Sequence, residues 1–559
     1  MWGNHTLKAG AFWEHVVNKQ PGSNFNNGRM GLANWVWNST GNTFADLLLG
    51  NVTSYEESEQ NVLHHIGYHR IEGFLQDSWK LAPRLTVDGG VRVAWIGPAD
   101  DLEGRGILVW DEARYDPQAP PSALSGMTWH AIDPSVPTTG VAMPVFVTPR
   151  VGFAWDVAGT GATVVRGGFG VYRYADPPAS YGNVIDLAYG VRYFSTCCGT
   201  SLGELEGLGA GEVVFAGQAI DKADDQQPRT LSWSLTLDRK LPWSTSLEIG
   251  YVGSKGDHQM NWGLAEYNAV PLGAMLDNPG GDANAYRPLP NYGNLAINRH
   301  SAYQNDHALQ ALLSRQRGRF NFTAAYTFSK NLGLKGADAN GYRANASEYA
   351  FDPREYNYGV LGTDRTHVAS LSWSLQLPDV KRGGAWQALF GDWQLAGVSS
   401  YVSGAPLMGW FGMQGTTAGG VLISSESITG SPDVYGMPVL TCDPRDDVRE
   451  GYLFNPACFT APTPGANGSA RQPYIKGQPY SNHDLSLAKS FPLGGKGQRL
   501  QLRVAAYNVF NHPIRYPDTA RNLTLVFDNG VQTNAEFGKL PEDNKYGRRI
   551  VQLSARFEF

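Results

Sequence analysis

The chain contains 559 residues, which is enough for one large domain or several smaller ones. Charged residues are only 17% of the total and the formal net charge is −6, so the composition provides no basic surface for nucleic acid. No run of 18 apolar residues occurs, and helical membrane spans are therefore not predicted.

Apolar and polar residues alternate along several segments, with the period of two that is typical of strands with one apolar face. In chain order, the alternation is clearest at 84–95, 229–241, 319–330, 366–378, 499–511 and 551–559. In "RTLSWSLTLDRKL", for example, Leu and Trp fill one face, while Ser, Thr and Asp fill the other. These segments are predicted to be β-strands.

The predicted strands are joined alternately by short and long connections. Short turns rich in Gly and Pro are expected at 82–83, 241–243, 317–318 and 494–497. Long, irregular connections are expected at about 97–144, 174–227, 257–304, 331–362, 403–480 and 511–545. Together with weaker candidates, the pattern gives roughly 14 to 18 strands, with tight turns at one end and long loops at the other.

This pattern favours a membrane barrel over a soluble sandwich or a β-propeller. The strands approach the ~9–11 residues that cross a bilayer, their polar faces suit a wet lumen, and no fixed blade period is present. A mean hydropathy of −0.31 is compatible with a barrel, whose strands alternate lipid-facing and lumen-facing residues. Tryptophans near strand ends are candidates for interface aromatics: Trp79, Trp95, Trp155, Trp243 and Trp393. We predict an all-β, transmembrane, antiparallel outer-membrane β-barrel with short periplasmic turns and long extracellular loops.

The last strand ends the chain without a tail. Its apolar face consists of Val551, Leu553, Ala555, Phe557 and Phe559. Because an unpaired strand edge is not tolerated in lipid, we predict that this strand closes the barrel by pairing with the first strand. It also fits a signal that barrel-insertion machinery reads; the alternative is a plain terminal strand of a soluble sheet.

Few residues indicate a disulfide, a metal site or a catalytic site. Cys442 and Cys458 flank a loop-like stretch and are a candidate disulfide pair, the alternative being two free thiols. His65 and His69 share a strand face but would lie about 13 Å apart, too far for one metal ion without a turn at Gly67. There is no HExxH or Walker pattern and no Rossmann fingerprint after a strand. The sequence therefore predicts no enzyme activity, no cofactor and no metal site.

Several segments resemble a known family. They are "GNTFADLLLG" (41–50), "GFLQDSWKLAPRLTVDGGVR" (73–92), "FNFTAAYTFSKNL" (320–332), "DWQLAGVSSYVSGAP" (392–406), "HDLSLAKSFPLGGKGQRLQLRVAAYNVFNHP" (483–513) and "RRIVQLSARFEF" (548–559). They are similar to the barrel region of TonB-dependent receptors, most closely the Oar-like group with a carboxypeptidase-regulatory-like N-terminal domain, which is abundant in acidobacteria. The resemblance implies the outer membrane of a Gram-negative bacterium.

The resemblance covers nearly the whole of residues 1–559, which we expect to form one barrel domain. The signal peptide, N-terminal β-sandwich and plug of the family are not visible before Met1. The expected function is binding and uptake of a polar substrate (oligosaccharide, peptide or chelate), with capture at the loops 97–144, 257–304 and 403–480. Expected partners are outer-membrane lipid and, where an upstream plug exists, the TonB complex. A non-transporting adhesin and a passive plugless pore are the alternatives.

Overall fold

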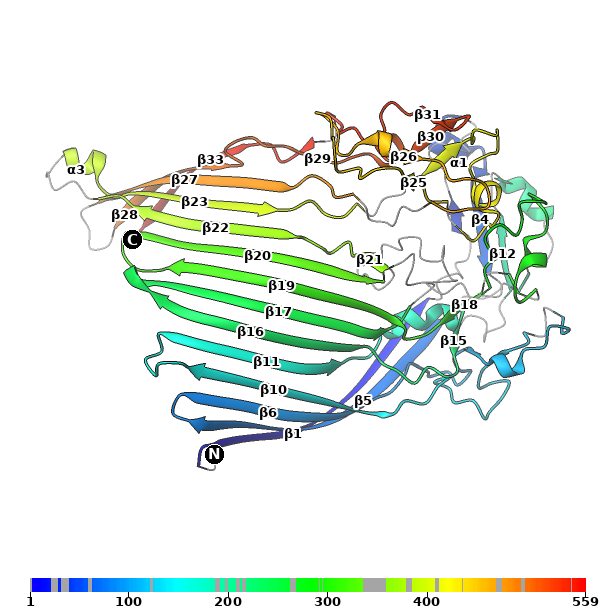
Figure 1. The fold of residues 1–559 in the computed structure, drawn as a ribbon, viewed down its shortest axis with the longest axis horizontal. Coiled ribbons are helices and arrows are strands. Elements are labelled where there is room, and N and C mark those ends of the chain that lie inside the picture. The colour runs from blue at the N-terminus through cyan, green and yellow to red at the C-terminus, as the bar shows by residue number, and fades with distance from the viewer. Residues whose placement is uncertain are drawn as a thin grey trace.

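The computed structural model describes residues 3–21, 29–31, 40–58, 63–120, 124–185, 192–196, 200–207, 212–213, 218–261, 268–290, 292–293, 295–334, 358–378, 385–407, 412–434, 436–468, 475–493, 498–543 and 545–559. One large antiparallel sheet dominates this part of the chain (Figure 1). None of the helices in these ranges is long and apolar enough to cross a membrane.

The sheet follows the chain order. Of its 16 described strands, β7 (Asp100–Asp101) and β21 (Tyr358–Val360) lie off the main path, which leaves 14. The path is β1 (His5–Pro21), β5 (Leu63–Ala82), β6 (Leu85–Ile96), β10 (Val145–Asp156), β11 (Thr163–Arg173), β16 (Arg229–Leu241), β17 (Thr245–Gln259), β19 (Ala302–Arg315), β20 (Phe320–Leu334), β22 (His367–Gln376), β23 (Trp393–Val402), β27 (Tyr480–Pro492), β28 (Arg499–Tyr507) and β33 (Ile550–Glu558). The predicted all-β antiparallel architecture and its strand number are confirmed.

Short turns gather at one end of the sheet and long loops at the other (Figure 1). The turn between β16 and β17 is a 3-10 turn, Pro242–Ser244, and β19 meets β20 after residues 316–319. The link between β22 and β23 is longer and carries the short helix α3 (Ala385–Phe390). The predicted long loops all leave from the other end. A further long connection, which the sequence did not predict, separates β1 from β5, and its described part contains β2 (Arg29–Gly31) and α1 (Thr43–Leu48).

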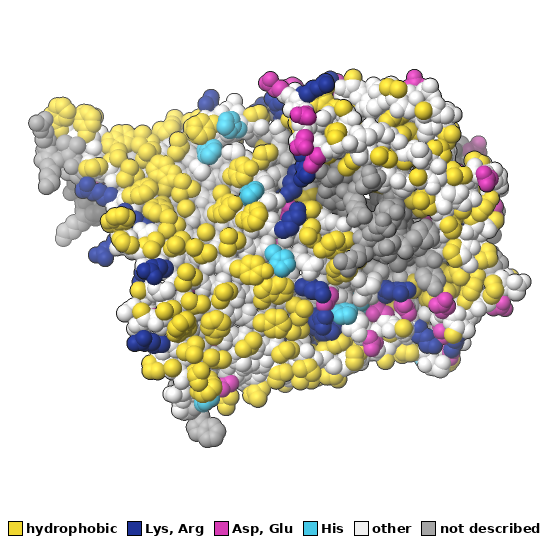
Figure 2. Space-filling model, in the orientation of Figure 1, with side chains coloured by type: hydrophobic (Ala, Val, Ile, Leu, Met, Phe, Trp, Pro, Cys, Tyr) yellow, Lys and Arg dark blue, Asp and Glu magenta, His cyan; other side chains and the backbone are white. Residues whose placement is uncertain are grey.

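The alternation of side chains gives the sheet two chemically different faces. Leu235 on β16 lies opposite Tyr251 on β17, and Ser234 lies opposite Val252. Opposed residues of antiparallel strands share a face, so Leu235 and Tyr251 belong to the apolar face and Ser234 to the other. Apolar side chains cover the strand surface in Figure 2. Leu235 is 53% exposed, as expected for a surface that lipid covers.

The predicted pairing of the last strand with the first is wrong. In the described residues β1 pairs only with β5, and β33 pairs only with β28. Figure 1 shows β1 and β33 at opposite edges of the sheet. A barrel closes only when strand number, tilt and register bring the two edges together, and these 14 strands curve the sheet only part of the way round.

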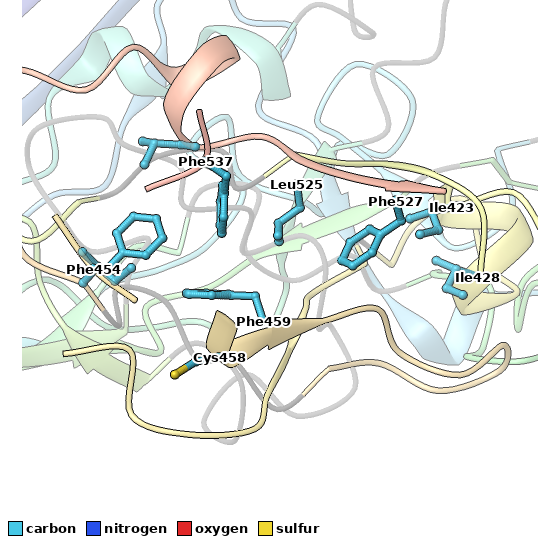
Figure 3. Close-up of a cluster of buried hydrophobic side chains, with 10 residues drawn as sticks. Ile423, Ile428, Phe454, Cys458, Phe459, Leu525, Phe527 and Phe537 are labelled. Carbon is cyan, nitrogen blue, oxygen red and sulfur yellow. The ribbon is translucent and has the colours of Figure 1, made fainter. Parts of the chain in front are cut away.

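The larger buried apolar clusters lie mainly in the loops, and two smaller ones lie at the loop ends of β6 and β10 and of β19 and β20. The largest cluster contains Phe454, Phe459 and Phe537, whose rings meet edge to face (Figure 3). Two further clusters combine the loops that follow β6, β11 and β17. The loops therefore fold into an ordered layer at one end of the sheet.

Candidate functional site

One row of side chains crosses eight strands on the polar face. Its successive cross-strand partners are Lys8, Gln76, Gly90, Arg150, Gly170, Ser232, Ser254 and Asp306. Every member of the row is polar or a glycine. The register therefore aligns polar groups from residues that are almost 300 positions apart in the sequence.

A hollow of about 710 Å³ lies on this face, across β1 to β16. Its polar lining consists of Lys8, Gln76, Asp88, Arg92, Thr148, Arg150, Tyr172, Ser232 and Ser234. Glycines of β6, β10 and β11 form part of its floor. One continuous hollow across six strands requires the sheet to curve toward its polar side, so the polar face is the concave one.

Arg150 is held in this hollow by an aromatic ring. Its guanidinium carbon lies 4.4 Å from the ring centre of Tyr172, which is a cation–π contact. The ring lies over Gly170, where an added Cβ would approach it to 2.9 Å. In the described part of the chain, no carboxylate forms an ion pair with Arg150 or Lys8. These two cations are therefore available to an anionic group of a bound molecule.

The charged side chains beside the hollow form ion pairs with one another. The carboxylate of Glu72 is 1% exposed and forms ion pairs with both Arg70 and Arg92. On the other side, Arg166 lies 2.7 Å from Asp238. A buried charge is tolerated only with such partners. These ion pairs therefore hold together the strands beside the hollow, which we call the wall. Arg150 and Lys8 take no part in these ion pairs, and neither does Asp88, the one carboxylate in the lining of the hollow.

A second, smaller hollow of about 380 Å³ lies farther along the same face. Its polar lining comes from β19 and the turn after it, and from β20, β22, β27 and β28: Arg315, Gln316, Asn321, Thr323, Ser372, Ser374, Asp484, Ser486, Arg503 and Tyr507. Hydroxyl and amide groups dominate this lining. The concave face thus offers hydrogen-bonding groups along most of its width.

Buried polar contacts tie the long loops together. Arg287 pairs with Asp433 at 2.7 Å, and the two side chains are only 5% and 6% exposed. This pair joins the loop after β17 to the loop after β23. Lys222 lies 2.7 Å from Asp111, and its hydrogen bond holds the pKa of that carboxyl below its usual value. The loops therefore form a defined surface above the hollow.

The two candidate disulfide cysteines are bonded. Cys442 and Cys458 form a disulfide with their Cα atoms 5.0 Å apart. Cys458 is fully buried in the Phe454 cluster. The bond therefore anchors the loop after β23 to that cluster. The described residues contain no group of three or more His, Cys, Asp or Glu side chains that could hold a metal ion.

The five predicted interface tryptophans lie near the two ends of the strands. Trp79, Trp155, Trp243 and Trp393 lie at the turn end, and Trp243 is 82% exposed in its turn. Trp95 lies at the loop end of β6. Their contact with a membrane interface stays a prediction.

The apolar residues of the last strand share the convex face. Val551, Leu553, Ala555 and Phe557 lie opposite apolar residues of β28. Leu553 is 77% exposed, and Phe559 follows the end of the strand. Recognition of this strand by insertion machinery stays a prediction.

Sequence reasoning placed substrate capture in the loops and missed the cations of the wall. Lys8 and Arg150 belong to no motif, and only the strand register brings them to one hollow. The available signal was weak: Arg150 occupies a polar-face position in a segment where most charged residues are absent.

Comparisons with solved structures find 117 matching chains. The outer membrane transporter YddB from Escherichia coli is 10% identical with a TM-score of 0.47, and the match covers 99% of this chain and 52% of that one. The FrpB iron transporter from Neisseria meningitidis is 11% identical with a TM-score of 0.41, at 99% and 54% coverage. The chain therefore spans about half the length of these proteins. The comparison with curated proteins finds no match.

A family model described as an outer membrane beta barrel domain matches residues 1–552. This match covers nearly the whole chain and agrees with the antiparallel sheet, its apolar convex face and its polar concave face. The chain is a protein of the outer membrane and belongs to the outer membrane beta barrel domain family.

Proposed function

We propose that this chain forms the wall and surface loops of an outer-membrane receptor that binds a polar substrate and takes it up along the concave face. The observation that carries the proposal is the 710 Å³ hollow, in which Arg150 and Lys8 lie among hydroxyl and amide groups. Such groups bind oligosaccharides, peptides or chelates by hydrogen bonds and charge. The loops at 97–144, 257–304 and 403–480 would capture the substrate first.

Within the family, the segments at 73–92 and 483–513 support the Oar-like group of TonB-dependent receptors. In that group, energy from the inner membrane reaches the barrel through TonB and a plug. The receptor proposed here would therefore transport only in a form that carries a plug. Residues 1–559 supply the wall and the loops, and no enzyme activity is assigned to them.

A second candidate is a surface-binding protein that does not transport. The packed loop layer supports it, because Arg287, Asp433 and the Cys442–Cys458 bond fix the loops as a rigid surface. A rigid surface of this kind would bind a partner without any movement of the wall.

One experiment separates these candidates. Cells that express the protein would receive labelled oligosaccharides, peptides and metal chelates, with and without a functional TonB. Accumulation that depends on TonB supports the receptor, and binding without accumulation supports the surface-binding protein. Accumulation that does not depend on TonB, together with ion conductance in a planar bilayer, would replace both with a passive pore.

A further inference from the structure

A band of cations and histidines borders the convex apolar face on its loop side. We call it the outer girdle; its members are Arg229, Lys255, His307, Lys330 and His367. Register places all five on the convex face. Lys255 lies opposite Leu231, and Lys330 lies opposite His307. Figure 2 shows Lys, Arg and His side chains between the apolar strand surface and the loop layer.

The two histidines of the girdle have matching surroundings. Tyr251 bonds through its hydroxyl to Nδ1 of His307 at 2.7 Å, and Tyr326 bonds in the same way to Nδ1 of His367 at 2.8 Å. The His367 ring also lies 5.3 Å from the ring of Phe328. Each imidazole therefore has one nitrogen fixed by a tyrosine and its plane against the apolar face. Such amphipathic groups mark the border between an apolar surface and a polar one.

The girdle has more positive than negative charge. Arg229 binds Asp257 with two hydrogen bonds of 2.6 and 2.7 Å, and Lys255 lies 3.7 Å from the same carboxylate. Lys330 is exposed and forms no ion pair within the described residues. Only Arg229 and Lys255 contact the carboxylate of Asp257, and together with Lys330 the girdle has three cations and one carboxylate, a surplus of two positive charges, 3 − 1. An anion that binds here would remove that imbalance.

The surface next to these cations identifies the kind of anion. Directly on the turn side of the girdle, Leu235, Leu309 and Phe328 are 53%, 49% and 47% exposed on the same face. A free phosphate would leave this apolar surface unused. An amphiphile uses both, because its acyl chains cover the apolar side chains while its charged head meets the cations.

We propose that the outer girdle binds the phosphate groups of a lipid in the outer leaflet of the outer membrane. The phosphates would contact Lys255, Lys330 and Arg229, and the acyl chains would lie on the convex face below. The tyrosine-bound histidines would donate or accept hydrogen bonds at the level of the head group. This inference does not depend on the transported substrate, because it concerns the opposite face of the sheet.

The test compares two lipids that differ only in phosphate. The purified protein would be placed in phosphatidylcholine nanodiscs that contain either diphosphorylated lipid A or the same lipid after dephosphorylation. Native mass spectrometry would then count the lipid A molecules retained per protein. We expect the phosphorylated lipid to be retained at least about tenfold better, since each lysine near an anionic head changes affinity about fivefold. Equal retention of the two lipids would overturn the proposal.

A pair of matched variants assigns the effect to the girdle. Lys255→Gln with Lys330→Gln should reduce retention of diphosphorylated lipid A to the level of the dephosphorylated form. Lys80→Gln with Lys240→Gln also removes two exposed lysines, but from the turn end of the sheet, and should retain lipid like the unaltered chain. Normal retention in the girdle variant would count against these residues. Because the lipid comparison uses the unaltered protein, the test does not depend on the folding of any variant.

Discussion

His300 lies between two carboxylates: its Nε2 is 2.6 Å from Asp176 and its Nδ1 is 2.7 Å from Asp224. The imidazole is buried and joins the loop after β11 to the segment before β19. Burial by itself would lower the pKa of His300, but the hydrogen bonds and charges of Asp176 and Asp224 raise it from 6.5 to about 9. His300 is therefore protonated at neutral pH and holds the two loops together as a cation.

This arrangement makes the loop layer sensitive to alkaline pH. A raised folded-state pKa gives stability that is complete below pH 6.5 and is lost as the pH rises from 6.5 through about 9. We expect faster hydrogen exchange in peptides around Asp176 and His300 at pH 9.5 than at pH 6, after correction for intrinsic rates. In His300→Gln this pH dependence should disappear. An unchanged pH dependence in the variant would assign the titration to another group.

Replacement of Arg150 tests the charge of the substrate. Arg150→Ala removes a cation that a bound anion would use, and charged hydrogen bonds of this kind contribute about 1.5–3 kcal/mol. We expect binding of an acidic oligosaccharide to weaken about ten- to a hundredfold by isothermal titration, with a smaller loss for a neutral oligosaccharide of equal length. Arg239→Ala, a control on the convex face, should change neither. An equal loss for both sugars would contradict an anionic substrate.

Removal of the disulfide should loosen one part of the loop layer. Cys442 and Cys458 are 16 residues apart, and a cross-link of that length contributes about 3 kcal/mol by restricting the unfolded chain. In Cys442→Ser with Cys458→Ser, we expect faster protease cleavage between residues 436 and 468 and no change in the strands. Reduction of the unaltered protein should reproduce this cleavage. Equal cleavage rates with and without the bond would mean that the Phe454 cluster alone holds the loop.

The sequence predicts those features that depend on local pattern. The strands β16 and β22 were predictable because a bilayer demands an apolar residue at every second position, and this demand is visible in each segment by itself. The pairing of Cys442 with Cys458 was likewise open to prediction from short spacing.

Features that depend on the whole sheet were not predictable. Whether β33 meets β1 depends on the curvature of the sheet summed over every strand. The sequence of a single strand does not reveal that sum. The hollow around Arg150 depends on the register of six strands in succession. His300 finds Asp176 and Asp224 only after two loops have packed against each other. Local alternation specifies each strand, whereas these sites belong to the assembly of strands and loops.

The two faces of β22 provide the sharpest test of the membrane assignment. Leu371 lies on the convex face, opposite Ala324 and Ser399, whereas the next residue, Ser372, lines the smaller concave hollow. Leu371→Arg would place a charge in lipid and should lower the free energy of unfolding by about 2–4 kcal/mol if it lies near the midplane. Ser372→Arg would place the same charge in the wet interior and should cost much less. Urea unfolding of both variants in phosphatidylcholine vesicles measures the difference, and equal costs would mean that the convex face is not the lipid face.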